Sequence, residues 1–328
     1  MNIEDVLRDT LADMAHEEPP PAPERFLRAV APRPRGARRR GMALAAAAAV
    51  AVLAAGTGAA VRGMSGERLE PAVSTGPMTR ATGEATASTE PGRADVGVIV
   101  KEGLRLADVL RKFAKASGRP LEEWERAARN VSELGLPDYA NGSLEGFAFP
   151  GVYQVAPGPR PELVLAGMVN LHRGTADQLG LVEGARRLGR SPRDIMIIAS
   201  IVQAESSSRQ DMPKVARTIY NRLGHKPPMA LNMDSPLMYA LGKYSVAASR
   251  EDLKSRSRYN TYRYKGLPPG PITNPGRDAI EAALRPATGS WLYYVEVDPK
   301  TGATKFAGSR AELERLLTER EGRTRAGS

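Results

Sequence analysis

The chain has 328 residues, of which 41% are hydrophobic and 26% charged, a balance that is typical of globular proteins and leaves room for about two domains. It contains no cysteine, which excludes disulfides, thiolate metal sites and cysteine nucleophiles. The net charge is +10, but the basic residues are dispersed among acids, so we expect a different anionic partner and no nucleic acid.

A membrane anchor is predicted near the beginning of the chain. Residues 1–40 form a tail that ends in an Arg-rich stretch, and residues 41–62 follow, rich in Ala, Val and Leu and without charge from 42 to 61. A helix of about twenty apolar residues crosses the hydrocarbon core, and the preceding arginines keep the N-terminus in the cytoplasm. We therefore predict a single-pass cell-membrane protein whose remaining residues lie outside the cytoplasm. A soluble Ala-rich helix and a cleaved signal peptide are the alternatives.

The residues that follow the anchor change from a linker to a folded pattern. The segment 63–94 is rich in Ser, Thr, Gly, Ala and Pro and lacks hydrophobic periodicity, which predicts a flexible linker. Beyond it the pattern is that of an α+β protein. A strand is expected at 96–101 and helices at 104–116 and 121–131, which together form a small α/β module at 95–142.

A larger mixed α+β domain is predicted at 143–318, followed by a disordered tail at 319–328. Its expected elements are an aromatic, strand-like segment at 144–155 and helices at 163–171, 175–188 and 213–223. A segment rich in Pro and Gly at 266–276 is either a preorganised binding loop or a rigid loop that packs on the core.

One helix of this domain is predicted to be buried. Ser191 is a good N-cap, Pro192 fits the first helical position, and residues 195–202 are almost all apolar, on every face. The helix runs directly into Glu205, where partial desolvation disfavours the ionised carboxylate and suits a general acid. The alternative is that Glu205 marks only the place where the helix meets water.

Six segments occur in the order that is found in one enzyme family. They are LEGFAFPGVY (144–153), ASIVQAES (199–206), IYNRL (219–223), LNMDSP (231–236), YNTY (259–262) and GLPPGPITNPG (266–276). Over residues 95–315 the chain resembles the YceG-like endolytic murein transglycosylases. The resemblance implies that 95–142 is a LysM-like glycan-binding module and that 143–318 is the catalytic domain.

The resemblance also implies the site residues. The family's catalytic acid falls on Glu205, while Gln203 replaces another acid of the family pattern and is expected to point away from the cleft. Thr304 replaces the family's His before the last strand. The positions expected to bind substrate are Glu145, Asn221, Asn232, Asp234, Tyr259, Asn260 and Tyr262. We expect no metal and no cofactor.

A single acid is sufficient for a lytic transglycosylase, because the substrate supplies the nucleophile. The expected reaction cleaves the MurNAc–GlcNAc bond within peptidoglycan strands and leaves 1,6-anhydro-MurNAc ends, which would terminate the elongation of nascent strands. The expected partners are therefore glycan strands, the membrane and peptidoglycan synthases. The alternatives are a muramidase that uses Glu145 or Asp234 as a second carboxylate, and a non-catalytic peptidoglycan-binding scaffold.

Overall fold

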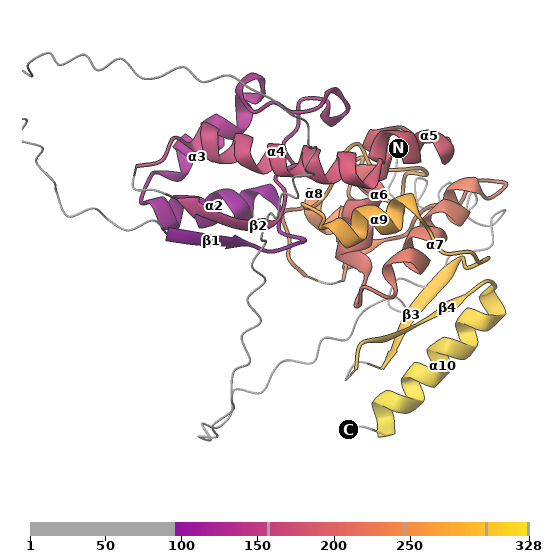
Figure 1. Cartoon of the computed structure of the whole chain (residues 1–328). Coiled ribbons are helices and arrows are strands. Elements are labelled where there is room, and N and C mark those ends of the chain that lie inside the picture. Colours follow the sequence, from indigo (N-terminus) through magenta and orange to yellow (C-terminus); the bar gives the residue numbers. More distant parts are fainter. Residues whose placement is uncertain (1–95, 156–157, 246, 299–300, 327–328) are drawn as a thin grey trace, which may run out of the picture. The chain divides into compact units, whose positions relative to one another are not determined.

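The computed structural model describes residues 96–155, 158–245, 247–298 and 301–326. These residues belong to one compact unit of helices and two small antiparallel sheets, which confirms the predicted mixed α+β class (Figure 1). The predicted cytoplasmic tail, membrane segment and linker lie outside the described residues. Within the described ranges, no helix is both long enough and apolar enough to cross a bilayer.

The N-terminal part of this unit is a strand–helix–helix–strand arrangement. Its elements are β1 (Val96–Val100), α2 (Leu106–Ser117), α3 (Leu121–Arg129) and β2 (Gly151–Val155), and β1 pairs antiparallel with β2. The two helices pack on each other through the buried rings of Phe113 and Trp124, which stack with their centroids 5.1 Å apart. The strand and the two helices predicted for this region are confirmed, with slightly shifted ends.

The residues before β2 differ from the prediction. The strand expected at 144–155 begins only at Gly151, because residues 144–150 form turns around Gly146, which has a φ of +92°. Two 3-10 turns precede this segment, at Val131–Glu133 and Asp138–Ala140. Since β1 pairs with β2, one sheet joins residues from both sides of the module boundary expected between 142 and 143.

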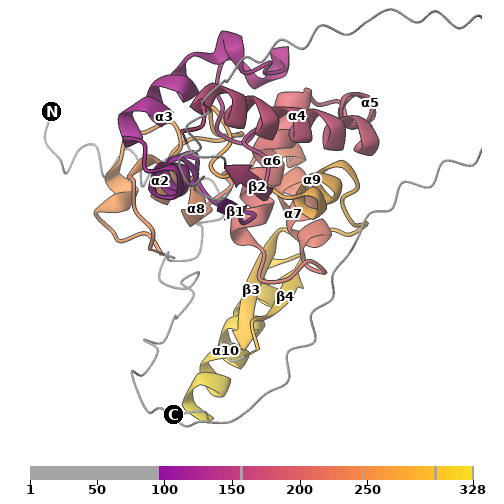
Figure 2. The same ribbon diagram turned by 60° about the vertical axis from the view of Figure 1, so that its left-hand side comes forward.

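The helical core is built around the predicted buried helix. It consists of α4 (Pro161–Leu179), α5 (Leu181–Arg187), α6 (Pro192–Glu205), α7 (Met212–Gly224), α8 (Asp234–Ala240) and α9 (Arg277–Leu284), with a 3-10 turn at Asp252–Lys254. Helix α6 packs against α5, α7 and α9 (Figures 1 and 2). Ser191 and Asp194 form a capping box at its start, and every residue from Ile195 to Val202 is buried. The buried helix is therefore confirmed.

The boundary between the two helices expected at 163–171 and 175–188 needs correction. Helix α4 continues without interruption to Leu179, and the break comes at Gly180, which has a φ of +63°. Left-handed backbone favours glycine and ends a helix, so the break occurs at the glycine and not at the polar residues before it.

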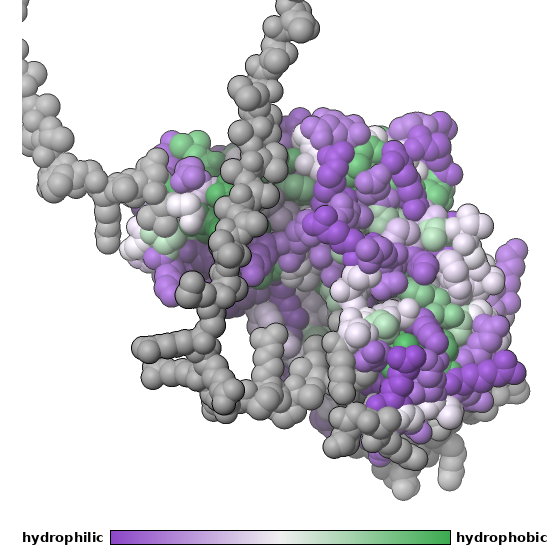
Figure 3. Space-filling view, turned by 60° about the horizontal axis from the view of Figure 1, so that its bottom comes forward, coloured by the Kyte–Doolittle hydropathy of each residue, from purple (hydrophilic) through white to green (hydrophobic). Residues whose placement is uncertain are grey.

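The C-terminal part packs around a second, smaller cluster of buried residues. Strands β3 (Tyr293–Asp298) and β4 (Ala303–Ala307) form a hairpin, and α10 (Arg310–Ala326) lies along it (Figure 2). The disordered tail expected from residue 319 is wrong for 319–326, which continue α10. On the face shown in Figure 3, hydrophilic residues predominate and apolar ones form separate patches.

The Pro- and Gly-rich loop of residues 266–276 packs against the core. Its residues from 270 to 276 are buried, and Asn274 Oδ1 accepts hydrogen bonds from the N–H groups of Gly146 and Ala148, both at 3.0 Å. Asn274 Nδ2 donates to the Leu104 carbonyl, also at 3.0 Å. The loop therefore packs on the core, as one of the two interpretations predicts.

The substitution Gly146→Ala should destabilise the fold more than Gly266→Ala does. Both glycines have strongly positive φ, +92° and +86°, so both substitutions strain the backbone. A Cβ on Gly146 would also come within 2.5 Å of Pro271, whereas one on Gly266 meets no atom within 4 Å. Overpacking of this kind costs about 1–3 kcal/mol, and urea unfolding should show that additional loss for Gly146→Ala. Equal losses for the two variants would contradict the packing at this position.

Candidate active site

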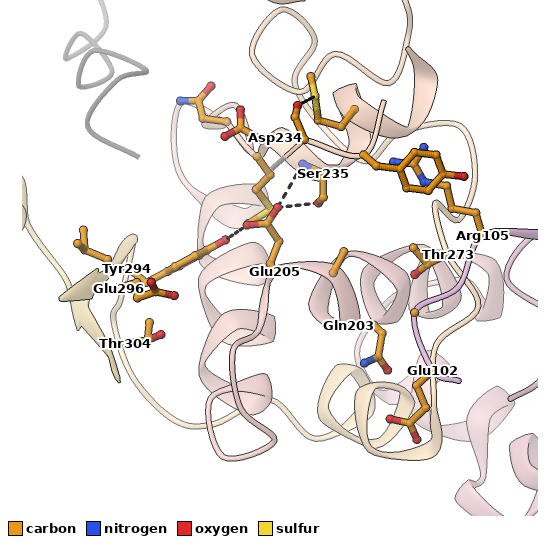
Figure 4. Close-up of a pocket in the computed structure, with 18 of the residues that line it drawn as sticks. Glu102, Arg105, Gln203, Glu205, Asp234, Ser235, Thr273, Tyr294, Glu296 and Thr304 are labelled. Carbon is orange, nitrogen blue, oxygen red and sulfur yellow. Dashed lines mark hydrogen bonds between the residues drawn. The ribbon is translucent and has the colours of Figure 1, made fainter. Parts of the chain in front are cut away.

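A cleft of about 480 Å³ lies beside the C-terminal end of α6 (Figure 4). Its walls come from the segment between β1 and α2, the end of α6, the beginning of α8 and the β3–β4 hairpin. The charged residues of its lining are Glu102, Arg105, Asp108, Glu205, Arg222, Asp234, Glu296 and Arg320. In the part of the chain that the structure describes, no three acidic or histidine side chains are grouped to hold a metal ion.

Glu205 is the last residue of α6, and its half-buried carboxyl group lies in the cleft (Figure 4). Ser235 Oγ donates a hydrogen bond to Glu205 Oε1 at 2.6 Å, and the Ser235 N–H approaches the same oxygen at 3.3 Å. Tyr294 Oη donates to Glu205 Oε2 at 2.8 Å. Both oxygens are thus held by groups from other elements, α8 and β3, so the side chain is oriented before substrate binds.

The beginning of α8 is positioned by the YNTY segment. Thr261 Oγ1 accepts a hydrogen bond from the Met233 N–H at 2.9 Å and donates one to the Met233 carbonyl at 2.8 Å. The Asn232 N–H donates to the Thr261 carbonyl at 3.1 Å, and Asn232 itself has a φ of +44°. This turn brings Asp234 and Ser235 into the lining of the cleft.

Asp234 is a second carboxyl group in the lining. Burial raises its pKa to about 6, and the nearby negative charge of Glu205 acts in the same direction. A hydrogen bond of 2.8 Å from Tyr262 Oη to Asp234 Oδ1 opposes this shift by stabilising the ionised form. The cleft therefore contains, besides Glu205, a carboxyl group whose pKa of about 6 lies close to neutral pH.

Arg222 is a buried cation that connects two walls of the cleft. Its Nε donates to the Leu292 carbonyl at 2.6 Å, and its Nη1 donates to the Leu231 carbonyl. These carbonyls belong to the segments that lead into β3 and α8, so one side chain fixes the origins of both elements that hold Glu205. Burial lowers the pKa of Arg222, and its charge interacts with Glu205 across the wall.

Comparison with known proteins places this cleft in a family context. The chain matches the YceG-like family over residues 47–319, which is most of its length. The chain belongs to the YceG-like family. A crystal structure of a yceG-like protein from Listeria monocytogenes superposes with a TM-score of 0.61 at 24% sequence identity, covering 69% of this chain and 76% of that one. That likeness shows a shared fold.

Two relatives bear the name endolytic murein transglycosylase. The protein from Bacillus subtilis (strain 168) is 33% identical over 154 residues, which cover 46% of this chain and 41% of the relative. The protein from Streptococcus pneumoniae serotype 2 (strain D39 / NCTC 7466) is 27% identical over 181 residues, which cover 54% of this chain and 32% of the relative. The matched region thus spans less than half the length of these curated relatives.

The predicted site residues of this YceG-like chain divide into two groups. Glu205, Asn232, Asp234 and Tyr262 line the cleft together, although they come from three separate motifs. The remaining four are outside the lining, and each contacts the protein itself: Glu145, Asn221, Tyr259 and Asn260. For this second group the observed geometry is that of support for the cleft walls.

Glu145 shows this supporting geometry most clearly. It is buried, and its Oε1 accepts hydrogen bonds from the Leu106 N–H at 3.0 Å and from Asn274 Nδ2 at 3.3 Å. It therefore joins the start of α2 to the loop of residues 266–276. Burial raises the pKa of Glu145 to about 7.

The two asparagines outside the lining bind backbone carbonyls. Asn221 Nδ2 donates to the carbonyls of Gly289 and Trp291, at 3.1 and 2.8 Å, and so fixes the segment before β3. Asn260 Nδ2 donates to the carbonyls of Leu253 and Ser255, both at 2.9 Å. Tyr259 packs on Tyr239, with ring centroids 5.3 Å apart.

The side chain of Gln203 does not lie where the sequence predicts it. It lines the cleft near Glu102, and its Oε1 accepts a hydrogen bond from the Gly276 N–H at 2.9 Å (Figure 4). The expectation that it points away from the cleft is therefore wrong, although Gln203 and Glu205 extend in different directions. Thr304, at the position of the family's His, also belongs to the lining.

Several residues of the cleft were not indicated by the sequence, among them Ser235, Tyr294 and Arg105. Ser235 adjoins the predicted Asp234, so its motif could have indicated it. Tyr294 lies 89 residues from Glu205 in an ordinary strand pattern, and Arg105 lies in the small N-terminal module. Neither has a local sequence signal, because only the packing of distant elements brings Tyr294 to Glu205 and Arg105 into the lining of the cleft.

The buried Glu145 should make the stability of this protein depend on pH. Between pH 4.5 and 7 the folded protein retains a proton at Glu145 that the unfolded chain has lost, so raising the pH lowers the free energy of unfolding. The size of this contribution is at most about 3 kcal/mol. Glu145→Gln cannot titrate and should lack it. Urea unfolding at pH 5 and pH 8 checks this, and a difference between wild type and variant that is constant with pH would contradict it.

Proposed function

We propose that the chain is an endolytic lytic transglycosylase that cleaves the MurNAc–GlcNAc bond of peptidoglycan strands. The observation that carries the proposal is Glu205, held in the cleft by Ser235 and Tyr294 at the end of a buried helix. Membership of the YceG-like family and the name of its relatives in Bacillus and Streptococcus support it.

The first half of the reaction uses Glu205 as a general acid. Its proton passes to the glycosidic oxygen while the bond from that oxygen to C1 of MurNAc breaks, and GlcNAc leaves as a neutral alcohol. The hydrogen bonds from Ser235 and Tyr294 keep the carboxyl group in one orientation during this step. Positioning of the strand by the cleft supplies the remaining rate enhancement.

The second half uses the same carboxyl group as a base. Glu205, now ionised, accepts the proton of the MurNAc C6 hydroxyl while that oxygen bonds to C1. The ring closes as 1,6-anhydro-MurNAc, no water is consumed, and Glu205 is returned to its starting state. One acid/base group is sufficient, and Gln203 in place of the family's other acid does not interrupt the cycle.

A hydrolytic muramidase is a second candidate because Asp234 lines the cleft close to Glu205. An ionised Asp234 could activate a water molecule, as the second carboxylate does in glycoside hydrolases. Glu145 is less suitable for this role, since it is buried outside the lining. The two reactions differ in their products, because hydrolysis leaves reducing ends and ring closure leaves anhydro ends.

The same proposal extends to the segments outside the cleft. The Arg-flanked apolar segment 41–62 supports a single-pass anchor that leaves the N-terminus in the cytoplasm and the cleft outside. Residues 95–142 contribute as a LysM-like glycan-binding module, and they already supply Glu102, Arg105 and Asp108 to the lining. A cut within a strand that is still being polymerised ends its growth, which makes peptidoglycan synthases the expected protein partners.

Glu205→Gln should reduce strand cleavage by at least about a hundredfold, because the amide retains the size of the side chain but cannot deliver a proton. Mass spectrometry of digested peptidoglycan measures the anhydro ends that the full-length protein releases. The variant should still fold and still bind strands. Near-normal production of anhydro ends by Glu205→Gln would falsify the mechanism and direct attention to Asp234.

Adding Gln203→Glu to the Glu205→Gln protein tests whether the position of the acid matters. The side chain at 203 is committed to the Gly276 N–H and extends in a different direction from that of Glu205. The double variant should therefore be as inactive as Glu205→Gln alone. Recovery of cleavage would show that the acid can act from either position.

Tyr294→Phe should lower kcat by about tenfold or more, because it removes one of the hydrogen bonds that orient Glu205. KM should change little, since the strand is held by the rest of the cleft. Tyr264→Phe is the matched control: its Oη donates only to the Arg256 carbonyl, and the residue lies outside the lining. A KM effect without a kcat effect at Tyr294 would contradict its orienting role.

A further inference from the structure

Arg105 occupies the end of the cleft that lies away from the β3–β4 hairpin (Figure 4). Its guanidinium lies over the ring of Tyr244, 4.3 Å from the centroid, and 5.5 Å from the centroid of Tyr239. Arg105 Nη2 also donates to the Lys243 carbonyl at 2.6 Å. These contacts hold a permanent positive charge in a fixed place beside the cavity.

Most of the hydrogen-bonding capacity of Arg105 is unused. A guanidinium carries five N–H donors, and the Lys243 carbonyl is the only acceptor that the described residues provide. Among the described residues, Arg105 also has no acidic partner within ion-pair distance. The two rings and one carbonyl therefore fix the position of the side chain but leave most of its N–H donors without an acceptor among the described residues.

The acids around Arg105 are engaged elsewhere or directed away. Asp108 is bound to Arg111 at 2.8 Å and accepts a hydrogen bond from Tyr244 Oη at 2.9 Å. Glu102 lies below Arg105 in the view of Figure 4, and its carboxyl group extends away from Arg105. Glu145 interacts electrostatically with Arg105, but it is buried and lies outside the lining of the cleft. An incoming anion would thus meet a cation that no neighbouring carboxylate already neutralises.

The proposed substrate contains one group that such a cation distinguishes. In a peptidoglycan strand GlcNAc and MurNAc alternate through the same kind of bond, and they differ in the lactyl ether of MurNAc. That ether ends in a free carboxylate or continues into a stem peptide that carries carboxylates. An enzyme that cuts only one of the two kinds of bond has to recognise this substituent.

We propose that Arg105 binds a carboxylate of the muramyl substituent and thereby places the MurNAc–GlcNAc bond, and not the alternate bond, at Glu205. A planar guanidinium donates two parallel hydrogen bonds to a carboxylate, which a neutral GlcNAc unit cannot accept in the same way. This inference rests on the proposed function and adds to it the substrate group that is recognised.

The test compares three full-length proteins: wild type, Arg105→Gln and the control Lys112→Gln. Lys112 is exposed on α2, which begins directly after Arg105, and lies outside the lining, so its substitution removes an equal charge elsewhere. One substrate is peptide-bearing glycan strands, and the other is the same strands after an amidase has removed the peptides and left lactyl carboxylates. Each substrate is used untreated and after its carboxylates have been converted to amides with carbodiimide and ammonia.

We expect Arg105→Gln to lower kcat/KM by about tenfold or more on at least one untreated substrate, mainly through KM, while Lys112→Gln has little effect. Amidation of that substrate should lower the wild-type value by a similar factor and leave Arg105→Gln almost unchanged, since both changes remove one interaction. The substrate that responds identifies the carboxylate as lactyl or peptide-borne.

Losses that multiply when the variant and the amidation are combined would overturn the proposal, because they would come from independent interactions. Unchanged kcat/KM in Arg105→Gln would overturn it as well. Should Arg105→Gln fail to fold, Arg105→Lys keeps the charge, loses the two-bond fork, and should respond less to amidation than wild type. If wild type releases no anhydro ends from any strand, the proposed function fails instead, and the same comparison with strand binding as the readout still decides the role of Arg105.

Discussion

The burial of α6 is the constraint on which the rest of the structure depends. A helix that is apolar on all faces must be surrounded, and α5, α7 and α9 provide that enclosure. Each large side chain removed from water contributes roughly 1.5–3 kcal/mol, so few arrangements of the neighbouring elements are tolerated. The helix can meet solvent only at its ends. Glu205 therefore stands at the boundary between a buried core and the cleft, where the proposed mechanism requires an acid and base.

The fold directs distant segments to this boundary through backbone hydrogen bonds. Arg222 binds the carbonyls that precede α8 and β3, and Thr261 binds both polar groups of Met233. Irregular segments contain many buried carbonyl and N–H groups, and each of these needs a partner. Asn221, Asn260 and Asn274 have the same task. Residue types that are well suited to sugar recognition are here used to hold the loops that carry the functional groups.

Three charged residues of the cleft differ in their surroundings. Arg222 is buried and bound to backbone carbonyls, and its charge interacts with Glu205. Asp234 is partly buried beside Glu205 and shares its electrostatic environment. Arg105 lies at the end of the cavity on two aromatic rings, with donors that the described residues leave unused. Arg222 is thus the buried cation that interacts with the proposed acid, and Arg105 is the cation that we propose to meet the substrate.

The sequence by itself determined the features that arise from local physics. Apolar residues on every face predicted the buried helix, and Ser191 and Pro192 predicted its start. The order of motifs identified the family and indicated Glu205 as the candidate acid. The turns around Gly146 were missed because a short aromatic segment also fits a strand. The end of α4 at Gly180 was missed because the break was expected at the polar residues before that glycine. Tertiary structure alone decided which polar residues face the cleft. Asn221 and Asn260 carry the same chemistry as Asn232, and only the location of buried carbonyls sends the first two inward. The contacts of Ser235 and Tyr294 with Glu205 join residues 30 and 89 positions away, a relation that no local pattern encodes.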